Sequence, residues 1–146
     1  MSETPDRKKY WIVRKKPVFI ALGVLIVVVA PFSIWIFGEL HAANKAFDVF
    51  CQKLIATDYD AAYAEASPDF QSAMTKQEFV EQQTTLRTRH GALKRVKRGD
   101  IETKFDSSGG FTTIEAIFIF ESAERQFTFR MKKVGSFWRV YSYKEL

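Results

Sequence analysis

The sequence has few of the residues that build metal sites and disulfide frameworks. Among its 146 residues there are one cysteine and two histidines. This excludes an internal disulfide framework and leaves little for a zinc site. A glycine-rich phosphate loop, cysteine–histidine ligand spacing and a carboxylate cluster are all missing from the sequence as well. We therefore expect no cofactor and no metal ion.

Net positive charge is scarce outside residues 1–16. The formal net charge is +5, of which residues 1–16 hold +4 from six basic and two acidic side chains. Residues 39–146 have sixteen basic and fifteen acidic side chains, a net charge of +1. Because duplex binding needs a broad basic surface, we expect no nucleic-acid partner. Aromatic residues make up 15% of the chain, so disorder throughout is not expected.

The longest uncharged run, residues 17–37, predicts a membrane anchor. A helix of these 21 residues is about 31 Å long, enough to cross the hydrocarbon layer. The bases in residues 1–16 predict a cytoplasmic N-terminus. A cleaved signal peptide is the alternative, but its apolar core is normally shorter, and no small-x-small cleavage site follows the run.

The predicted organisation therefore has three parts. Residues 1–16 form a basic cytoplasmic tail, residues 17–38 form a transmembrane helix, and residues 39–146 form an exported domain. The protein is expected to be a single-pass protein of the inner (plasma) membrane, with a periplasmic or otherwise extracytoplasmic C-terminal domain.

The first half of the exported domain has the patterns of helices. Apolar residues at three- and four-residue spacing predict a helix over residues 40–57, and a short second helix follows over 59–65. Thr75 and Glu78 match a capping box, which predicts the start of a third helix. This helix is expected to end before Gly91.

Beyond the third helix the apolar period changes to that of β-strands. The pattern predicts four antiparallel strands, over residues 93–105, 111–121, 125–134 and 137–143. The apolar parity of the first strand shifts near Gly99, which predicts a β-bulge there.

Turn signals predict how these strands pair. Gly135–Ser136 suits a two-residue hairpin turn. A second two-residue turn, at Ala123–Glu124, would pair Phe118 with Phe129. Because side chains alternate along a strand, this register sorts them onto two faces.

The predicted inner face of the sheet is apolar and the outer face is mixed. The inner face collects Ile114, Ala116, Phe118, Phe120, Phe127, Phe129, Met131, Trp138 and Val140. The outer face includes the candidate partner-binding residues Ile117, Ile119, Arg130, Tyr141 and Tyr143. A contiguous apolar surface rimmed by charge is typical of association sites, although the first strand or the C-terminal tail could instead cover it.

Several short stretches carry a family resemblance. They are Ala46-Phe47-Asp48-Val49-Phe50, Asp58-Tyr59-Asp60-Ala61-Ala62-Tyr63, Ser67-Pro68-Asp69-Phe70, Phe79, and Gly135-Ser136-Phe137-Trp138-Arg139-Val140. Together with three helices followed by four strands, they resemble membrane-anchored, uncharacterised bacterial members of the nuclear-transport-factor-2-like (cystatin-like) superfamily, over about residues 40–144.

The resemblance implies an α+β fold: a single N-terminal transmembrane helix, then a cone-shaped domain of three helices packed on a curved four-stranded antiparallel sheet. It also implies that the convex sheet face is a common dimerisation surface, which leaves a homodimer open. The superfamily includes isomerases, dehydratases, transport adaptors and secretion scaffolds, so the fold alone assigns no activity.

Candidate chemistry is sparse. Enzymes of this fold place an acid or a His–Asp pair inside the cone, where the predicted inner face here is wholly apolar. Tyr59 and Tyr63 are candidates for the mouth of a pocket, with helix capping and packing as the alternative. Cys51 lies in an apolar helical stripe and is expected to be a buried, unreactive side chain. We expect no catalytic residue.

A run of basic residues follows the third helix. Arg95, Lys97 and Arg98 are candidates for contact with lipid headgroups or an acidic partner. The alternative, which the sequence favours equally, is that these residues form a solvent-exposed helix end and strand face without a partner.

Together these features favour a non-catalytic accessory, scaffold or assembly subunit of a membrane protein complex. Its partners would be other membrane protein subunits and the lipid bilayer. The alternative is a small-molecule-binding module or small enzyme that uses the cone as an apolar pocket. The bulk of Phe118, Phe120 and Trp138 favours a filled cone.

Overall fold

The computed structural model describes residues 37–106 and 109–146. The predicted basic tail, residues 1–16, and all but the last two residues of the predicted span, 17–38, lie outside the described residues. Within the described part, no helix combines the length and the apolar character needed to cross a bilayer.

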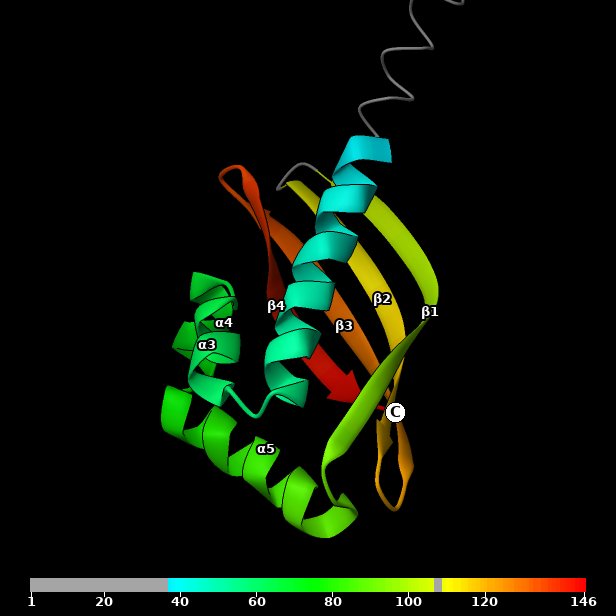
Figure 1. Ribbon diagram of the computed structural model, residues 1–146. Helices are drawn as coiled ribbons and strands as arrows, with labels where there is room; N and C mark the ends of the chain where they lie inside the picture. The colour runs from blue at the N-terminus through cyan, green and yellow to red at the C-terminus, as the bar shows by residue number, and fades with distance from the viewer. Residues whose placement is uncertain (1–36, 107–108) are drawn as a thin grey trace, which may run out of the picture. The chain divides into compact units, whose positions relative to one another are not determined.

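The described residues form an α+β structure with one antiparallel sheet, as predicted. After a helix over residues 37–55 come three labelled helices: α3 (Tyr59–Ala64), α4 (Pro68–Ala73) and α5 (Lys76–His90). The strands follow in the order β1-β2-β3-β4: β1 (Leu93–Asp106), β2 (Gly109–Phe120), β3 (Glu124–Val134) and β4 (Phe137–Glu145). Figure 1 shows a curved sheet with the first of these helices lying along one face.

Local side-chain chemistry starts each labelled helix. Asp58 caps α3, and Ser67 caps α4 by accepting a hydrogen bond from the N–H of Phe70. The predicted capping box of α5 is confirmed, since Thr75 and Glu78 each accept from the other's backbone N–H. The short helix α4 is additional to the three predicted helices.

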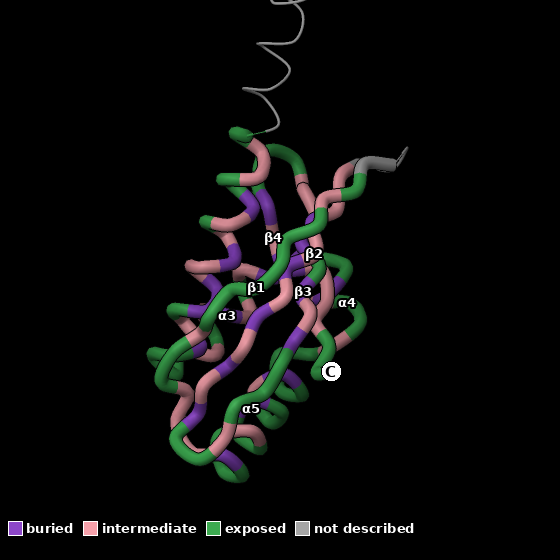
Figure 2. The backbone as a smooth tube through the Cα atoms, turned by 90° about the vertical axis from the view of Figure 1, so that its right-hand side faces the viewer, coloured by how far each residue is buried: buried purple, intermediate pink, exposed green. Residues whose placement is uncertain are grey.

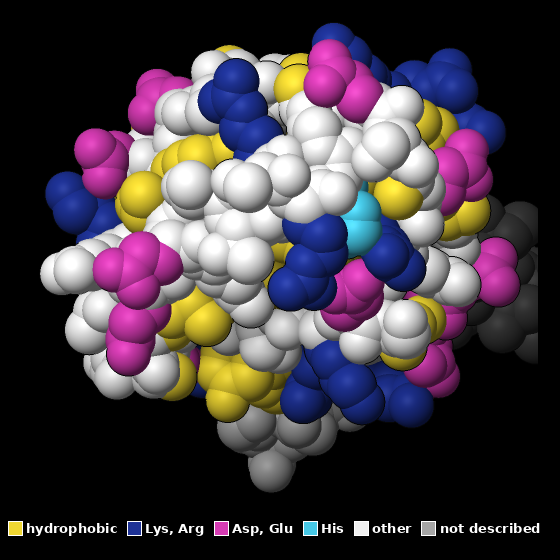
Figure 3. Space-filling view, turned by 90° about the horizontal axis from the view of Figure 1, so that it is seen from below, with side chains coloured by type: hydrophobic (Ala, Val, Ile, Leu, Met, Phe, Trp, Pro, Cys, Tyr) yellow, Lys and Arg dark blue, Asp and Glu magenta, His cyan; other side chains and the backbone are white. Residues whose placement is uncertain are grey.

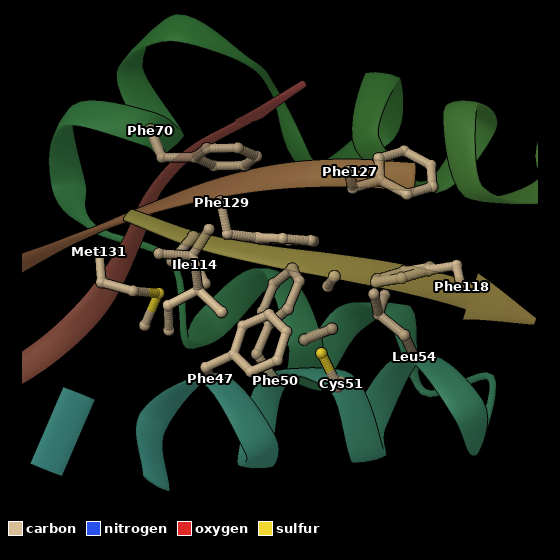
Figure 4. Packing of buried hydrophobic residues seen from close by; sticks show 14 of the residues in the cluster. Phe47, Phe50, Cys51, Leu54, Phe70, Ile114, Phe118, Phe127, Phe129 and Met131 are labelled. Carbon is tan, nitrogen blue, oxygen red and sulfur yellow. The ribbon is translucent and has the colours of Figure 1, made fainter. Parts of the chain in front are cut away.

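The core lies between the helix over residues 37–55 and the inner face of the sheet (Figure 4). Phe47, Phe50, Cys51 and Leu54 project from one stripe of that helix and are buried. All nine residues predicted for the inner face are buried as well. The alternation of the strands therefore predicted correctly which side of the sheet meets the helices.

The predicted register between β2 and β3 is wrong by four positions. Phe129 pairs with Ile114 rather than with Phe118, and the turn lies at Glu121–Ser122. Tertiary hydrogen bonds hold this turn, because the N–H groups of these two turn residues donate to the carbonyls of Ala92 and His90. Four is an even number, so the slip leaves every side chain on its predicted face.

Three register shifts interrupt the described sheet, the first of them between Leu93 and Arg95. The predicted bulge at Gly99 is confirmed, because the register shifts between Arg98 and Ile101. The third shift, between β3 and β4, adds Tyr141 as an extra residue on β4. Beyond it the parity of β4 reverses, so the predicted outer-face position of Tyr143 is wrong: its ring stacks on Phe129, with 5.4 Å between centroids, and packs, partly buried, against the core.

A partly buried carboxylate ties the start of the domain to the β3–β4 hairpin. Glu39 has a side chain only 16% exposed and accepts hydrogen bonds from Lys133 Nζ at 2.5 Å and Trp138 Nε1 at 2.9 Å. The hydrogen bond from Lys133, followed by that from Trp138, holds the pKa of Glu39 below its ordinary value of 4.5, although burial opposes the shift.

This contact predicts a component of acid sensitivity. Because the pKa of Glu39 is lower in the folded state, its contribution to stability is present above about pH 4.5 and is lost as the pH falls through the folded-state pKa. Glu39→Gln should therefore flatten the dependence of unfolding free energy on pH below pH 4.5. Urea unfolding at a series of pH values measures this. Lys133→Met should flatten the same range, and an unchanged profile in Glu39→Gln would contradict the assignment.

Candidate functional site

The interior of the domain is filled with side chains. The gap bounded by Phe50, Leu54, Phe118, Phe129 and neighbouring side chains is too small to admit a water molecule. The aromatic rings that surround it lie in edge and stacked contacts, such as the 5.6 Å between the centroids of Phe118 and Phe129. This arrangement stabilises the fold and leaves no room at that place for a substrate.

The two tyrosines predicted at a pocket mouth have structural contacts. The hydroxyl of Tyr63 donates to the carbonyl of Met74 at 2.7 Å, and its ring packs against Phe79 with 5.7 Å between centroids. Tyr59 packs, partly buried, against the same core. The contacts of both residues therefore agree with the alternative of helix capping and packing.

Loss of solvation favours the neutral form of two other groups with nucleophilic or acid–base potential, the buried Cys51 and the partly buried Tyr143. Burial, and secondarily the charge of Asp48, raise the pKa of the Cys51 thiol, whose residue is 4% exposed. Burial also raises the pKa of the Tyr143 hydroxyl, which donates to Gln82 at 2.5 Å and accepts from Gln83 at 2.9 Å. Neither group is set up to ionise near neutral pH.

The C-terminal end of α5 carries a polar cluster. His90 is buried, and its Nε2 accepts a hydrogen bond from Arg125 Nε at 3.3 Å. The hydroxyl of Ser122 donates to the carbonyl of His90 at 2.9 Å. Figure 3 shows basic and acidic side chains gathered around a histidine on the side seen from below. These contacts dock the β2–β3 turn onto the helix end.

The described residues contain no group of three or more histidine, cysteine, aspartate or glutamate side chains arranged to hold a metal ion.

The outer face of the sheet carries a compact group of aromatic and basic side chains, here called the aromatic–cation cluster: Phe111, Arg130, Lys132 and Tyr141. The rings of Phe111 and Tyr141 lie 5.4 Å apart. The guanidinium of Arg130 lies 4.9 Å from the centroid of Phe111 and 5.8 Å from that of Tyr141. Lys132 Nζ lies 5.4 Å from the Tyr141 ring and pairs with Asp69 at 2.8 Å.

Phe111 and Lys132 were not among the predicted site residues. Phe111 pairs with Lys132 across β2 and β3, which brings its ring beside Arg130. The predicted pairing of Phe118 with Phe129 would place Glu115 opposite Lys132. It therefore did not indicate that Phe111 lies beside Lys132 and Arg130. The sequence did contain a signal for Phe111. The odd-numbered residues of β2 were predicted to face outward, and Phe111 is one of them.

The register also divides the predicted partner-binding residues into two groups. Tyr141 and Arg130 belong to the aromatic–cation cluster. Ile117 and Ile119 lie six and eight positions farther along β2 than Phe111, too far to share that cluster.

These two isoleucines are instead neighbours of the basic run. Ile117 pairs with Lys97, and Ile119 pairs with Arg95. Arg98 points to the other side of β1 and lies 3.7 Å from Asp48.

No protein-family model and no curated protein matches this chain in sequence.

Proposed function

We propose that this protein is a non-catalytic accessory or assembly subunit of a membrane protein complex. In this proposal residues 17–38 anchor it in the inner membrane, residues 1–16 lie in the cytoplasm, and residues 39–146 form an extracytoplasmic, nuclear-transport-factor-2-like domain that binds other subunits. The uncharged run and the bases before it support the anchor. The α+β order with a curved antiparallel sheet is compatible with that superfamily.

The observation that carries the binding role is the aromatic–cation cluster. Tyrosine and arginine are the residue types enriched at interface hot spots, because each combines a large contact area with directional polar groups. Here both side chains, with Phe111, pack together on the outer face of the sheet, away from the core. The two rings, which meet edge to face, hold the Arg130 guanidinium in place and so reduce the entropy that a partner must remove on binding.

The filled interior supports binding over catalysis. A small-molecule site normally needs a cavity of several hundred Å³ with a few polar groups directed into it. The gap in the core does not admit water, and burial raises the pKa of the one ionisable group among the side chains that line it, Tyr143.

The direct test is mild-detergent extraction from native membranes, native-size separation and mass spectrometry of the co-migrating proteins. A defined large assembly supports the proposed role, and its other members name the process. Migration as a monomer or a homodimer alone would contradict the role of accessory subunit.

A charge reversal within the cluster should release the partners. Arg130→Glu is expected to lower the recovery of co-purified subunits by about tenfold, because it removes the cation from the two rings and places a carboxylate against them. Arg130 is exposed, so the unfolding free energy should change by less than about 1 kcal/mol. Quantitative mass spectrometry and urea unfolding measure the two effects.

Lys45→Glu is the matched control, since it makes the same charge change at an exposed position of the helix over residues 37–55. Its recovery of partners should equal that of the unmodified protein. Equal losses in both variants would mean that net charge, and not the cluster, controls assembly.

A further inference from the structure

A groove of about 590 Å³ separates the helix over residues 37–55 from the edge of the sheet. On one side it is lined by residues 94–98 of β1, and on the other by Phe47, Asp48, Cys51 and Gln52 from one stripe of the helix. It lies apart from the aromatic–cation cluster, which β2, β3 and β4 form.

The backbone edge of β1 faces this groove. Successive side chains of a strand point to opposite faces of the sheet. The five consecutive residues 94–98 nevertheless all line the groove, so the groove must border the backbone edge of β1. Among the strands of residues 37–106 and 109–146, β1 stands at the end of the sheet order and pairs only with β2. Figure 2 shows that β1 is exposed along most of its length. Its outward N–H and C=O groups are therefore available to a further strand.

The groove has an apolar floor and a basic rim. Phe47 and Cys51 are buried at the floor, beside the half-buried Val96. Arg95 and Lys97 are exposed at the rim, and within the described part of the chain neither forms an ion pair.

The other two bases of this segment are already neutralised. Lys94 pairs with Glu121 at 2.6 Å, and Arg98 pairs with Asp48 at 3.7 Å. Two positive charges therefore remain beside an open strand edge.

We propose that this groove binds an acidic, extended segment of another protein as an added strand on β1. Main-chain hydrogen bonds to the β1 edge would supply affinity. Alternate apolar side chains of the segment would rest on the floor of Phe47, Cys51 and Val96, and its acidic side chains would meet Arg95 and Lys97. The basic run was predicted to contact lipid headgroups or an acidic partner. In this proposal the partner is acidic, and it binds at the edge of β1.

The positive charge of the rim favours an acidic segment over two other occupants of the groove, the protein's own N-terminal residues and a second copy of the chain. The protein's own residues 1–16 carry +4 and would be repelled by the rim. A second copy paired edge to edge about this segment would bring two basic runs opposite each other, and like charges directly opposite destabilise a strand pair.

The experiment uses the full chain in nonionic detergent and a fluorescent peptide of alternating glutamate and valine, followed by fluorescence anisotropy. Saturable binding is expected, and Arg95→Glu with Lys97→Glu should weaken it by about tenfold or more. Lys144→Glu, a charge reversal at the exposed end of the opposite edge strand β4, should change it less than about twofold. No saturation by about 1 mM would overturn the proposal.

Two further peptides separate strand addition from charge alone. One is N-methylated at each valine and the other at each glutamate, so that each lacks the N–H groups along one edge. One of the two must lose binding; equal binding of both and of the parent would reduce the site to electrostatic attraction and overturn strand addition. Anionic phosphatidylglycerol vesicles that displace the peptide with the same dependence on Arg95 would assign the surface to lipid instead.

Hydrogen exchange of the unmodified chain keeps the test independent of any variant's folding. The peptide should slow exchange of the amides of residues 94–98, while those around Tyr141 stay unchanged. Lack of protection at β1 would exclude the groove. Because the assembly test of Arg130→Glu uses a different face, either proposal can fail without the other.

Discussion

Replacing Phe129 by alanine should remove about 3–5 kcal/mol of unfolding free energy, enough to unfold a domain of ordinary stability. Phe129 is 1% exposed and lies at the centre of the core. Its ring lies 5.1 Å from that of Phe47, 5.6 Å from that of Phe118 and 5.4 Å from that of Tyr143, measured between centroids. Truncation therefore leaves a cavity among the helix, β2 and β4 at once. Urea unfolding followed by far-ultraviolet circular dichroism measures the loss.

Phe137→Ala is the matched control, because it deletes the same atoms at a residue that is 68% exposed. Its unfolding free energy should stay within about 0.5 kcal/mol of that of the unmodified protein. A loss below about 1.5 kcal/mol in Phe129→Ala would show that the core collapses around the missing ring and is not rigidly packed.

Gly91→Ala should cost about 2–4 kcal/mol, from two causes that act together. Gly91 has φ +82°, a conformation that side-chain-bearing residues rarely adopt. A Cβ atom here would also lie 2.7 Å from Cβ of Glu121, in the turn that docks onto the end of α5. Thermal and urea unfolding should both report the destabilisation.

Gly135→Ala separates the conformational penalty of a positive φ from the steric contact with Glu121. Gly135 also has a positive φ, +61°, but no atom lies within 4 Å of the position that a Cβ would take. It should therefore cost only the conformational penalty, about 1–2 kcal/mol. Equal losses in the two variants would mean that Glu121 moves aside freely, and that the docked turn does not hold the β2–β3 register.

Features that depend on neighbouring residues in the chain were predictable. The capping box at Thr75 needs only the side chain three residues later, and the Gly135–Ser136 hairpin needs only its own turn. The inner face of the sheet followed from strict alternation, which survives any even error in register. These local rules were enough for the α+β class and for the composition of the core.

The candidate site depended on contacts between distant parts of the chain. Glu121–Ser122 has no strong turn signal of its own, and the backbone around His90 holds it in place. That docking brings Phe111 to Arg130 and separates Ile117 and Ile119 from Tyr141. Sequence alternation alone could not have shown this division.

The sequence by itself determined which strand residues face the core up to the bulge in β4, where α5 begins and which segments become strands, because these depend on polarity and on bonds within a few residues. The tertiary structure decided which outer-face residues become neighbours, where β4 bulges at Tyr141, and that the edge of β1 borders a basic groove. Strand register is set by the sum of many distant contacts, and a register shift that changes every neighbour can leave the hydrophobic pattern unchanged.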